Sequence, residues 1–90
     1  MIRIHMIVSG RVQGVGFRIT TQLKASEMGV TGWVRNRSDG TVELEAEGPP
    51  NIVYPFVEFI ENGPSRFIKV EHVEKQLLEN TKGYTTFDIK

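Results

Sequence analysis

The chain has 90 residues, and its 11 basic and 11 acidic side chains leave no net charge at neutral pH. A sequence of this length folds as one domain with a modest core, and the absence of cysteine excludes disulfide bonds, thiolate metal ligands and a cysteine nucleophile. No apolar run is long enough to span a membrane, and Arg3 and His5 interrupt the apolar N-terminus, so we predict a cytoplasmic protein without a signal peptide.

The first part of the chain predicts a strand followed by a helix. Apolar residues alternate over Ile2–Val8, which is typical of a half-buried strand. Residues Arg18–Met28 then show a helical pattern that ends at Gly29, a common C-terminal cap. The residues of this helix that we expect to face the core are Ile19, Leu23, Ala25 and Met28.

A β-hairpin is predicted next. Val30–Asn36 has the character of a strand, with Trp33 as a core or cleft-wall residue, and the Asp-Gly pair within Ser38–Gly40 is a strong turn signal. Thr41–Glu47 follows as a strand in which apolar and acidic residues alternate. We expect a buried face made of Val42, Leu44 and Ala46 and a solvated face made of Glu43, Glu45 and Glu47.

The last part predicts a second helix and two further strands. The helix is expected from about Asn51 to Asn62, with Pro55 near its first turn, and Gly63-Pro64 ends it. Its apolar residues at helical spacing are Val53, Phe56, Val57 and Ile60. Phe67–Lys75 and Tyr84–Ile89 are predicted strands, and the second of them is short and at an edge.

This order of elements predicts an α+β fold. It matches the βαββαβ order of the ferredoxin-like split β-α-β sandwich, in which two helices cover one face of an antiparallel sheet. We expect a single domain over residues 1–90. Enzymes, metal proteins and RNA binders share this fold, so the function has to be argued from a site.

The loop between the first strand and the first helix is the strongest candidate site. Gly10, Gly14 and Gly16 lie among the arginines Arg11 and Arg18, immediately before the helix. In such a loop the backbone N–H groups and the helix dipole attract an anion, and an arginine in the first turn can hold a phosphate or carboxylate by two hydrogen bonds. The same composition also fits a tight structural turn. The spacing matches neither a P-loop nor a dinucleotide-binding motif.

The end of the second strand supplies another candidate. In a split β-α-β fold the third strand lies between the first and the second, so Arg35-Asn36-Arg37 can approach the glycine loop. Asn36 would then face the same space as Arg18 and orient a water molecule without repelling an anion. Alternatively, Asn36 and Arg37 only open the hairpin turn, for which asparagine is well suited.

Other chemistry is poorly represented. Residues 1–40 carry a net charge of +4 and residues 41–90 of −4, either by chance or because the basic half forms a small electropositive cleft. His5 and His72 are far apart, and no serine has a His/Asp framework. An arginine, a set of N–H groups and a placed water are still enough to hydrolyse a mixed carboxylic–phosphoric anhydride, because its leaving group is already a carboxylate.

Two long segments resemble the signature motifs of the acylphosphatase family. The first is Gly10-Arg11-Val12-Gln13-Gly14-Val15-Gly16-Phe17-Arg18, and the second is Gly32-Trp33-Val34-Arg35-Asn36 with Asp39-Gly40-Thr41-Val42-Glu43. The resemblance extends over nearly all of the chain, including Glu47-Gly48-Pro49 and Gly63-Pro64.

The resemblance implies metal-independent hydrolysis of the carboxyl–phosphate bond of small acyl phosphates. Arg18 would bind the phosphate, and Asn36 would position the attacking water. The phosphate-binding loop that the resemblance implies comprises Arg11, Val12, Gln13, Gly14, Val15, Gly16 and Phe17. It implies no cofactor and no metal, with inorganic phosphate as product and competitive inhibitor. We expect a monomer without a nucleic-acid or membrane partner.

Two other functions stay open from the sequence. One is an accessory domain that handles carbamoyl phosphate inside a larger carbamoyl-transferring enzyme. The other is an RNA-binding domain, which the acidic rather than aromatic strand face disfavours. The chain departs from the family pattern at Ile19-Thr20, at Pro55 and at Ser65-Arg66-Phe67, which affects packing and the shape of the cleft.

Overall fold

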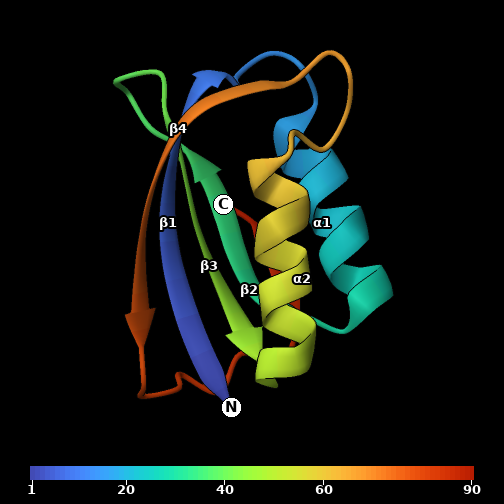
Figure 1. Ribbon diagram of the computed structural model, residues 1–90, viewed down its shortest axis with the longest axis vertical. Helices are drawn as coiled ribbons and strands as arrows, with labels where there is room; N and C mark the ends of the chain where they lie inside the picture. Colours follow the sequence, from blue (N-terminus) through green and yellow to red (C-terminus); the bar gives the residue numbers. More distant parts are fainter.

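The computed structural model describes residues 1–90 and has a five-stranded sheet with both helices on one face (Figure 1). The strands are β1 (Ile2–Arg11), β2 (Thr31–Asn36), β3 (Val42–Gly48), β4 (Lys69–Leu78) and β5 (Phe87–Ile89). The helices are α1 (Phe17–Met28) and α2 (Pro50–Glu61). The predicted βαββαβ order, followed by a terminal strand, is confirmed.

The strand order places the two candidate segments at one end of the sheet. The order is β4-β1-β3-β2-β5, with every pair antiparallel except the parallel pair of β2 and β5. The third strand therefore lies between the first and the second, as predicted. Because Val8 of β1 and Asn36 of β2 both pair with Val42 of β3, the β1–α1 loop and the β2–β3 hairpin lie at the same end (Figure 1).

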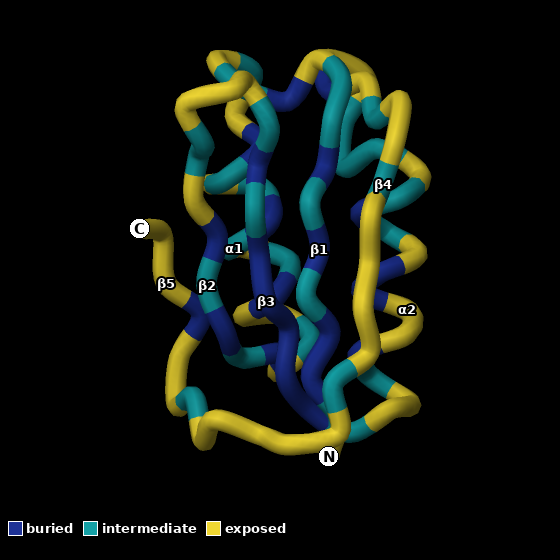
Figure 2. Tube along the Cα trace, turned by 90° about the vertical axis from the view of Figure 1, so that its left-hand side faces the viewer, coloured by how far each residue is buried: buried dark blue, intermediate teal, exposed yellow.

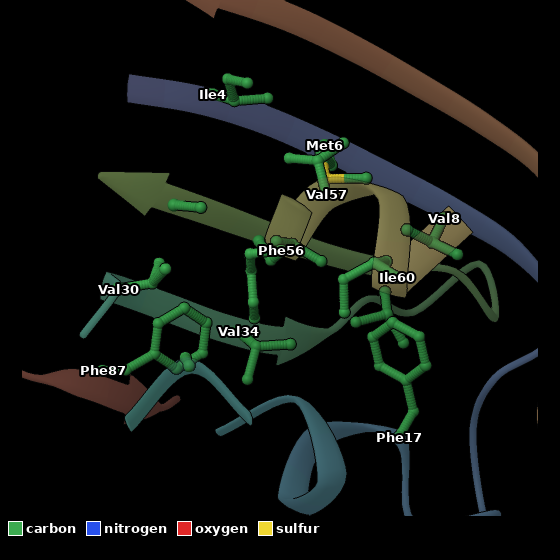
Figure 3. Close-up of a cluster of buried hydrophobic side chains, with 14 of the residues drawn as sticks. Ile4, Met6, Val8, Phe17, Val30, Val34, Phe56, Val57, Ile60 and Phe87 are labelled. Carbon is green, nitrogen blue, oxygen red and sulfur yellow. The ribbon is translucent and has the colours of Figure 1, made fainter. Parts of the chain in front are cut away.

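The core lies between the sheet and the helices (Figure 3). Every second residue of β1 faces it, and the predicted buried face of α2 is confirmed, since Val53, Phe56, Val57 and Ile60 are each at most 3% exposed. Phe56 meets Phe87 of β5 edge to face at 5.9 Å between ring centroids. This contact packs the short edge strand against the second helix, while parallel pairing with β2 holds it in the sheet.

Helix α1 turns a different face to the core than predicted. Phe17, Thr21 and Ala25 are buried, whereas Ile19 and Leu23 are 60% and 65% exposed. The prediction that Ile19 and Leu23 face inward is therefore wrong, although Ala25 is buried and Met28 packs against the core. The helix begins at the buried Phe17. Ile19 follows two residues later and so lies about 200° around the helix axis, on the side that faces solvent.

The sheet face opposite the helices is also less solvated than predicted. Glu47 is only 1% exposed, and its carboxylate accepts hydrogen bonds from three backbone N–H groups, those of Lys82, Gly83 and Tyr84. Glu45 forms an ion pair with Arg3 at 2.9 Å. The segment between β4 and β5 crosses this end of the molecule (Figure 2) and supplies the partners of Glu47. The alternation along β3 is as predicted, but Glu45 and Glu47 are buried structural groups.

Trp33 lies on this outer face and not in the core. Its indole N–H donates to the Tyr84 hydroxyl, and that hydroxyl donates to Glu45 at 2.7 Å. Burial and the hydrogen bond to the carboxylate of Glu45 raise the pKa of Tyr84 above its ordinary value. Glu43, the third acidic residue of β3, contacts His5 and Arg35. Burial acts to raise the pKa of Glu43, but the hydrogen bonds from His5 and Arg35 outweigh it, so the pKa is lowered.

Several element boundaries differ from the prediction. Helix α2 begins at Pro50, so Pro55 falls in the second turn and removes the N–H that would bond to the carbonyl of Asn51. Both residues are exposed, and water can satisfy that carbonyl. Strand β4 begins at Lys69 and continues to Leu78, and β5 covers only Phe87–Ile89. Neither helix is long and apolar enough to cross a membrane.

Candidate active site

A hollow of about 210 Å³ lies where the β1–α1 loop meets the end of β2. We call it the loop hollow. Its lining residues are Val12, Gly14, Gly16, Phe17, Arg18, Ile19 and Asn36. The structure thus brings Arg18 and Asn36, which are 18 positions apart in the sequence, to one space. Three residues of the predicted phosphate-binding loop, Arg11, Gln13 and Val15, do not line it.

The backbone of the loop has features that are typical of an anion site. Gly14 and Gly16 have φ of +74° and +80°, and a Cβ at either position would meet no other atom within 4 Å. Glycine is therefore required by the left-handed backbone conformation and not by crowding from the protein. None of the 11 backbone hydrogen bonds outside the helices and strands is donated by a residue between Val12 and Ile19. The N–H groups of the loop therefore make no backbone hydrogen bond of this kind and can face a ligand.

The start of α1 adds to this electropositive character. The N-cap of α1 is Gly16, so no side chain caps the first N–H groups of the helix, and its first turn holds no acidic residue. The first N–H groups of a helix lack partners within the helix, and together with the helix dipole they favour a bound anion. Arg18 stands in this first turn, as predicted, and its guanidinium forms no ion pair within 4 Å.

Asn36, the last residue of β2, lines the loop hollow on the side of the sheet. Alternation along β2 puts it on the same side as the fully buried Val34, which faces the helices. Its side-chain oxygen Oδ1 is buried and has no hydrogen-bond partner. Leaving a buried acceptor unpaired costs about 1–3 kcal/mol, so such a group calls for an explanation. An amide oxygen accepts hydrogen bonds, and a water molecule between it and an anion would satisfy it.

Gln13 makes a structural contact that could not be predicted from the sequence. Its side-chain amide donates to the backbone carbonyls of Arg37 at 2.8 Å and Thr41 at 2.9 Å. It therefore ties the glycine loop to the hairpin that carries Asn36. No spacing rule pairs residue 13 with residues 37 and 41, because the contact depends on the order of the strands in the sheet, which brings the loop and the hairpin together.

The hairpin is closed by its own polar contacts. Asp39 accepts hydrogen bonds from the hydroxyl and the backbone N–H of Thr41, at 2.6 and 3.0 Å. These two bonds lower the pKa of Asp39. The N–H of Arg37 in turn donates to the carbonyl of Thr41 at 2.9 Å. The Asp-Gly turn is therefore fixed locally, and Asn36 is held just before it.

The remaining candidates lie elsewhere. His5 pairs with Glu43 at 2.7 Å on the outer sheet face, and His72 is exposed on β4. No three side chains of the His, Cys, Asp and Glu types are grouped so that they could hold a metal ion. The loop hollow itself has one guanidinium and one amide among its lining side chains, and no carboxylate, imidazole or thiol.

Fold and hollow together define a small α+β protein with a candidate anion site at the end of its sheet. The acylphosphatase family model matches residues 4–89. An acylphosphatase of Bacillus velezensis is 47% identical over 89 residues, which cover 99% of this chain and 98% of that protein. The crystal structure of the acylphosphatase from Bacillus subtilis matches with a TM-score of 0.95 and 44% identity, covering 100% of this chain and 99% of the other. The chain therefore belongs to the acylphosphatase family, and this membership makes it a hydrolase with acylphosphatase activity.

The fold also occurs inside a much longer protein. Full-length HypF, solved in a phosphate- and nucleotide-bound form, matches with a TM-score of 0.86 and 30% identity. The match covers 100% of this chain but only 12% of HypF.

Proposed function

We propose that this chain hydrolyses the carboxyl–phosphate bond of small acyl phosphates without a metal ion, using Arg18 to bind the phosphate and Asn36 to orient the water. One observation carries the proposal. An arginine without an ionic partner and a buried amide oxygen without a hydrogen bond share one hollow at a helix N-terminus. The first suits a phosphate and the second suits a water molecule next to it.

The loop provides the remaining phosphate contacts in this proposal. Backbone N–H groups of the segment from Arg11 to Phe17 surround the phosphate oxygens, and Arg18 adds a planar, two-pronged hydrogen bond from one side. Phosphoryl transfer spreads negative charge over these oxygens in the transition state, so fixed donors at this place lower the barrier. Of this segment, Val12, Gly14, Gly16 and Phe17 line the hollow, whereas Arg11, Gln13 and Val15 do not.

The water attacks phosphorus while Asn36 accepts one of its hydrogen bonds. A new bond forms between the water oxygen and phosphorus, and the bond between phosphorus and the acyl oxygen breaks. The electron pair of that bond leaves with the carboxylate, and the water proton ends on the phosphate. Because the carboxylate is a good leaving group, no acid is needed to protonate it, and an orienting amide is enough.

The test compares substrates and variants in one assay of phosphate release. We expect rapid hydrolysis of acetyl phosphate and little of p-nitrophenyl phosphate, and both rates should persist after extensive chelation. Arg18→Ala should lower kcat/KM for acetyl phosphate by roughly 10²–10³-fold, the typical cost of one lost charge-stabilising donor. Arg18→Lys should recover little, because a point charge cannot reproduce the guanidinium geometry.

A matched control separates this effect from a general loss of positive charge. Arg35 is the residue before Asn36, but it pairs with Glu43 on the outer face. Arg35→Ala should therefore keep near-normal activity. Wild-type activity that disappears with chelator and returns with one divalent ion would refute the metal-free mechanism. Carbamoyl phosphate belongs in the substrate panel because an accessory domain that handles this compound is the alternative left open by the sequence, and hydrolysis of it alone would favour that function.

A further inference from the structure

A second hollow, of about 510 Å³, adjoins the loop hollow and carries three cationic side chains. We call it the basic hollow. Its lining residues are Arg11, Gly14, Val15, Arg66, Phe67 and Lys69. Gly14 lines both hollows, so a molecule whose phosphate lies at the loop can extend into the basic hollow. No acidic side chain lines it.

The three cations have no partner within the protein. None of Arg11, Arg66 and Lys69 forms an ion pair within 4 Å, although Glu71 follows Lys69 by two residues on β4. The same strand does pair a cation elsewhere, since Lys75 contacts Glu61 at 2.9 Å. The three cations of the basic hollow are therefore not neutralised by a carboxylate of the protein, which leaves their positive charge available to a ligand.

Two further features concentrate this charge. Arg11 of β1 stands directly opposite Lys69 of β4 in the strand register, and like charges in that position destabilise a sheet unless an anion lies between them. The guanidinium carbon of Arg66 lies 4.9 Å from the centre of the Phe67 ring, which is itself 63% exposed. The ring holds the guanidinium by a cation–π contact while the guanidinium donors stay free.

The hollow also accounts for a departure noted in the sequence. The departure is at Ser65-Arg66-Phe67, and two of these three residues line the basic hollow. The connection from α2 to β4 that carries them runs beside the β1–α1 loop (Figure 1). Arg66 and Phe67 thus bring a cation and an aromatic ring next to the candidate site.

We propose that the basic hollow binds a second anionic group, a carboxylate or a phosphate, on the acyl portion of the substrate. This inference rests on the proposed function, and it narrows the substrate class to acyl phosphates whose acyl group carries its own negative charge. Acetyl phosphate would then be a generic substrate that leaves the basic hollow unused.

The kinetic test measures kcat/KM for succinyl phosphate and for acetyl phosphate. Both substrates carry the same phosphate group, so the ratio of the two values cancels the contribution of that group and reports on the additional carboxylate of succinyl phosphate. In the double variant Arg66→Gln/Lys69→Gln we expect this ratio to fall about fivefold, the scale of two exposed charge contacts. Lys82→Gln, at the other end of the sheet, should leave the ratio unchanged. An unchanged ratio in the double variant overturns the inference.

A binding measurement keeps the inference testable if hydrolysis itself fails. Succinylphosphonate and acetylphosphonate are stable analogues of the two substrates, and their Kd values follow from NMR titration of the wild-type chain and the double variant. We expect tighter binding of succinylphosphonate to the wild type and loss of that preference in the double variant. Equal affinities in the wild type would overturn the inference. Absent acetyl phosphate hydrolysis, in contrast, would count against the proposed function alone.

Discussion

At the scale of single residues, the candidate site assigns binding and orientation to different side chains. Asn36 tests this division, because its amide would act on the water and not on the bound phosphate. We expect Asn36→Ala to lower kcat for acetyl phosphate by roughly 10²–10³-fold with little change in KM, as for an interaction made mainly in the transition state. Steady-state kinetics at several substrate concentrations gives both constants.

The variant Asn36→Asp distinguishes this function from a purely structural one. Aspartate suits a turn nearly as well as asparagine, so a structural function predicts a mild effect. A carboxylate in the loop hollow would repel the phosphate, and we then expect weaker inhibition by inorganic phosphate than in Asn36→Ala. A fully active Asn36→Asp enzyme with a normal Tm would leave Asn36 a structural residue only.

Gln13 provides a second prediction at this scale. Its two hydrogen bonds to the hairpin hold the glycine loop against the strand that ends in Asn36. We expect Gln13→Ala to lower kcat/KM about tenfold, because displacements of an ångström or less at a reacting centre have large effects on rate. Gln22 is the matched control: its side chain donates to the carbonyl of Phe87 at 3.0 Å, near the edge strand. Gln22→Ala should lower Tm similarly without changing kcat/KM, and equal kinetic losses in both variants would argue against a positioning function for Gln13.

At the scale of elements, strong patterns were predictable and weak ones were not. The apolar spacing of α2 identified all four of its buried residues, and the alternation in β3 identified its core face. In α1 the pattern misled, because its buried face contains Thr21 and a small alanine while Ile19 and Leu23 point to solvent. The burial of Glu45 and Glu47 depends on the distant Arg3 and Tyr84, and no local pattern contains that information.

The candidate site, too, has parts that the sequence predicts and parts that it does not. That Arg18 and Asn36 would share one hollow was predictable, because the glycine loop before α1 and the turn after β2 are clear in the sequence and the strand order brings them together. The tie from Gln13 to the hairpin and the basic hollow were not. Both depend on contacts between loops whose relative position only the packed sheet fixes.

Helix α2 gives a prediction about an element. Pro55 stands in its second turn, where it removes one backbone hydrogen bond, and its own side chain is exposed. Proline is about 3 kcal/mol less favourable than alanine inside a helix, so we expect Pro55→Ala to raise the free energy of unfolding by roughly 1–3 kcal/mol. Urea denaturation would measure the change, and Pro64→Ala, after the helix has ended, is the control without such a gain. A lower stability of Pro55→Ala would show that proline restricts the unfolded chain more than it disturbs the helix.

At the scale of the whole molecule, the ion pairs of the outer face make stability depend on pH. The pKa of Glu43 is lowered in the folded state, so its ionised form stabilises the fold above the ordinary value near 4.5. This stabilisation is lost as pH falls through the lowered pKa. We expect Glu43→Gln to be less stable than the wild type at pH 7 and the difference to shrink below pH 4.5, as measured by urea denaturation at pH 7, 4.5 and 3.5. Glu58→Gln, an exposed change in α2, should show a constant difference, and a gap that widens in acid would contradict the assignment.

We expect substitutions at the two ends of the sheet to have different effects, on activity at the loop end and on stability at the other. The loop hollow lies at one end, and at the other Glu47 holds the segment before β5 by three backbone hydrogen bonds of 2.6 to 3.2 Å. Replacing this carboxylate by an amide leaves at least one buried N–H donor facing an NH₂ group, so we expect Glu47→Gln to lower the free energy of unfolding by about 1–3 kcal/mol. Because the change lies away from the loop, kcat/KM for acetyl phosphate at 25 °C should stay within about twofold of the wild type, as for sites that are far apart and act independently. Glu79→Gln, an exposed change in the same segment, should alter neither quantity. A Glu47→Gln protein that is folded at 25 °C but has lost most of its activity would show that the two ends are coupled through the sheet.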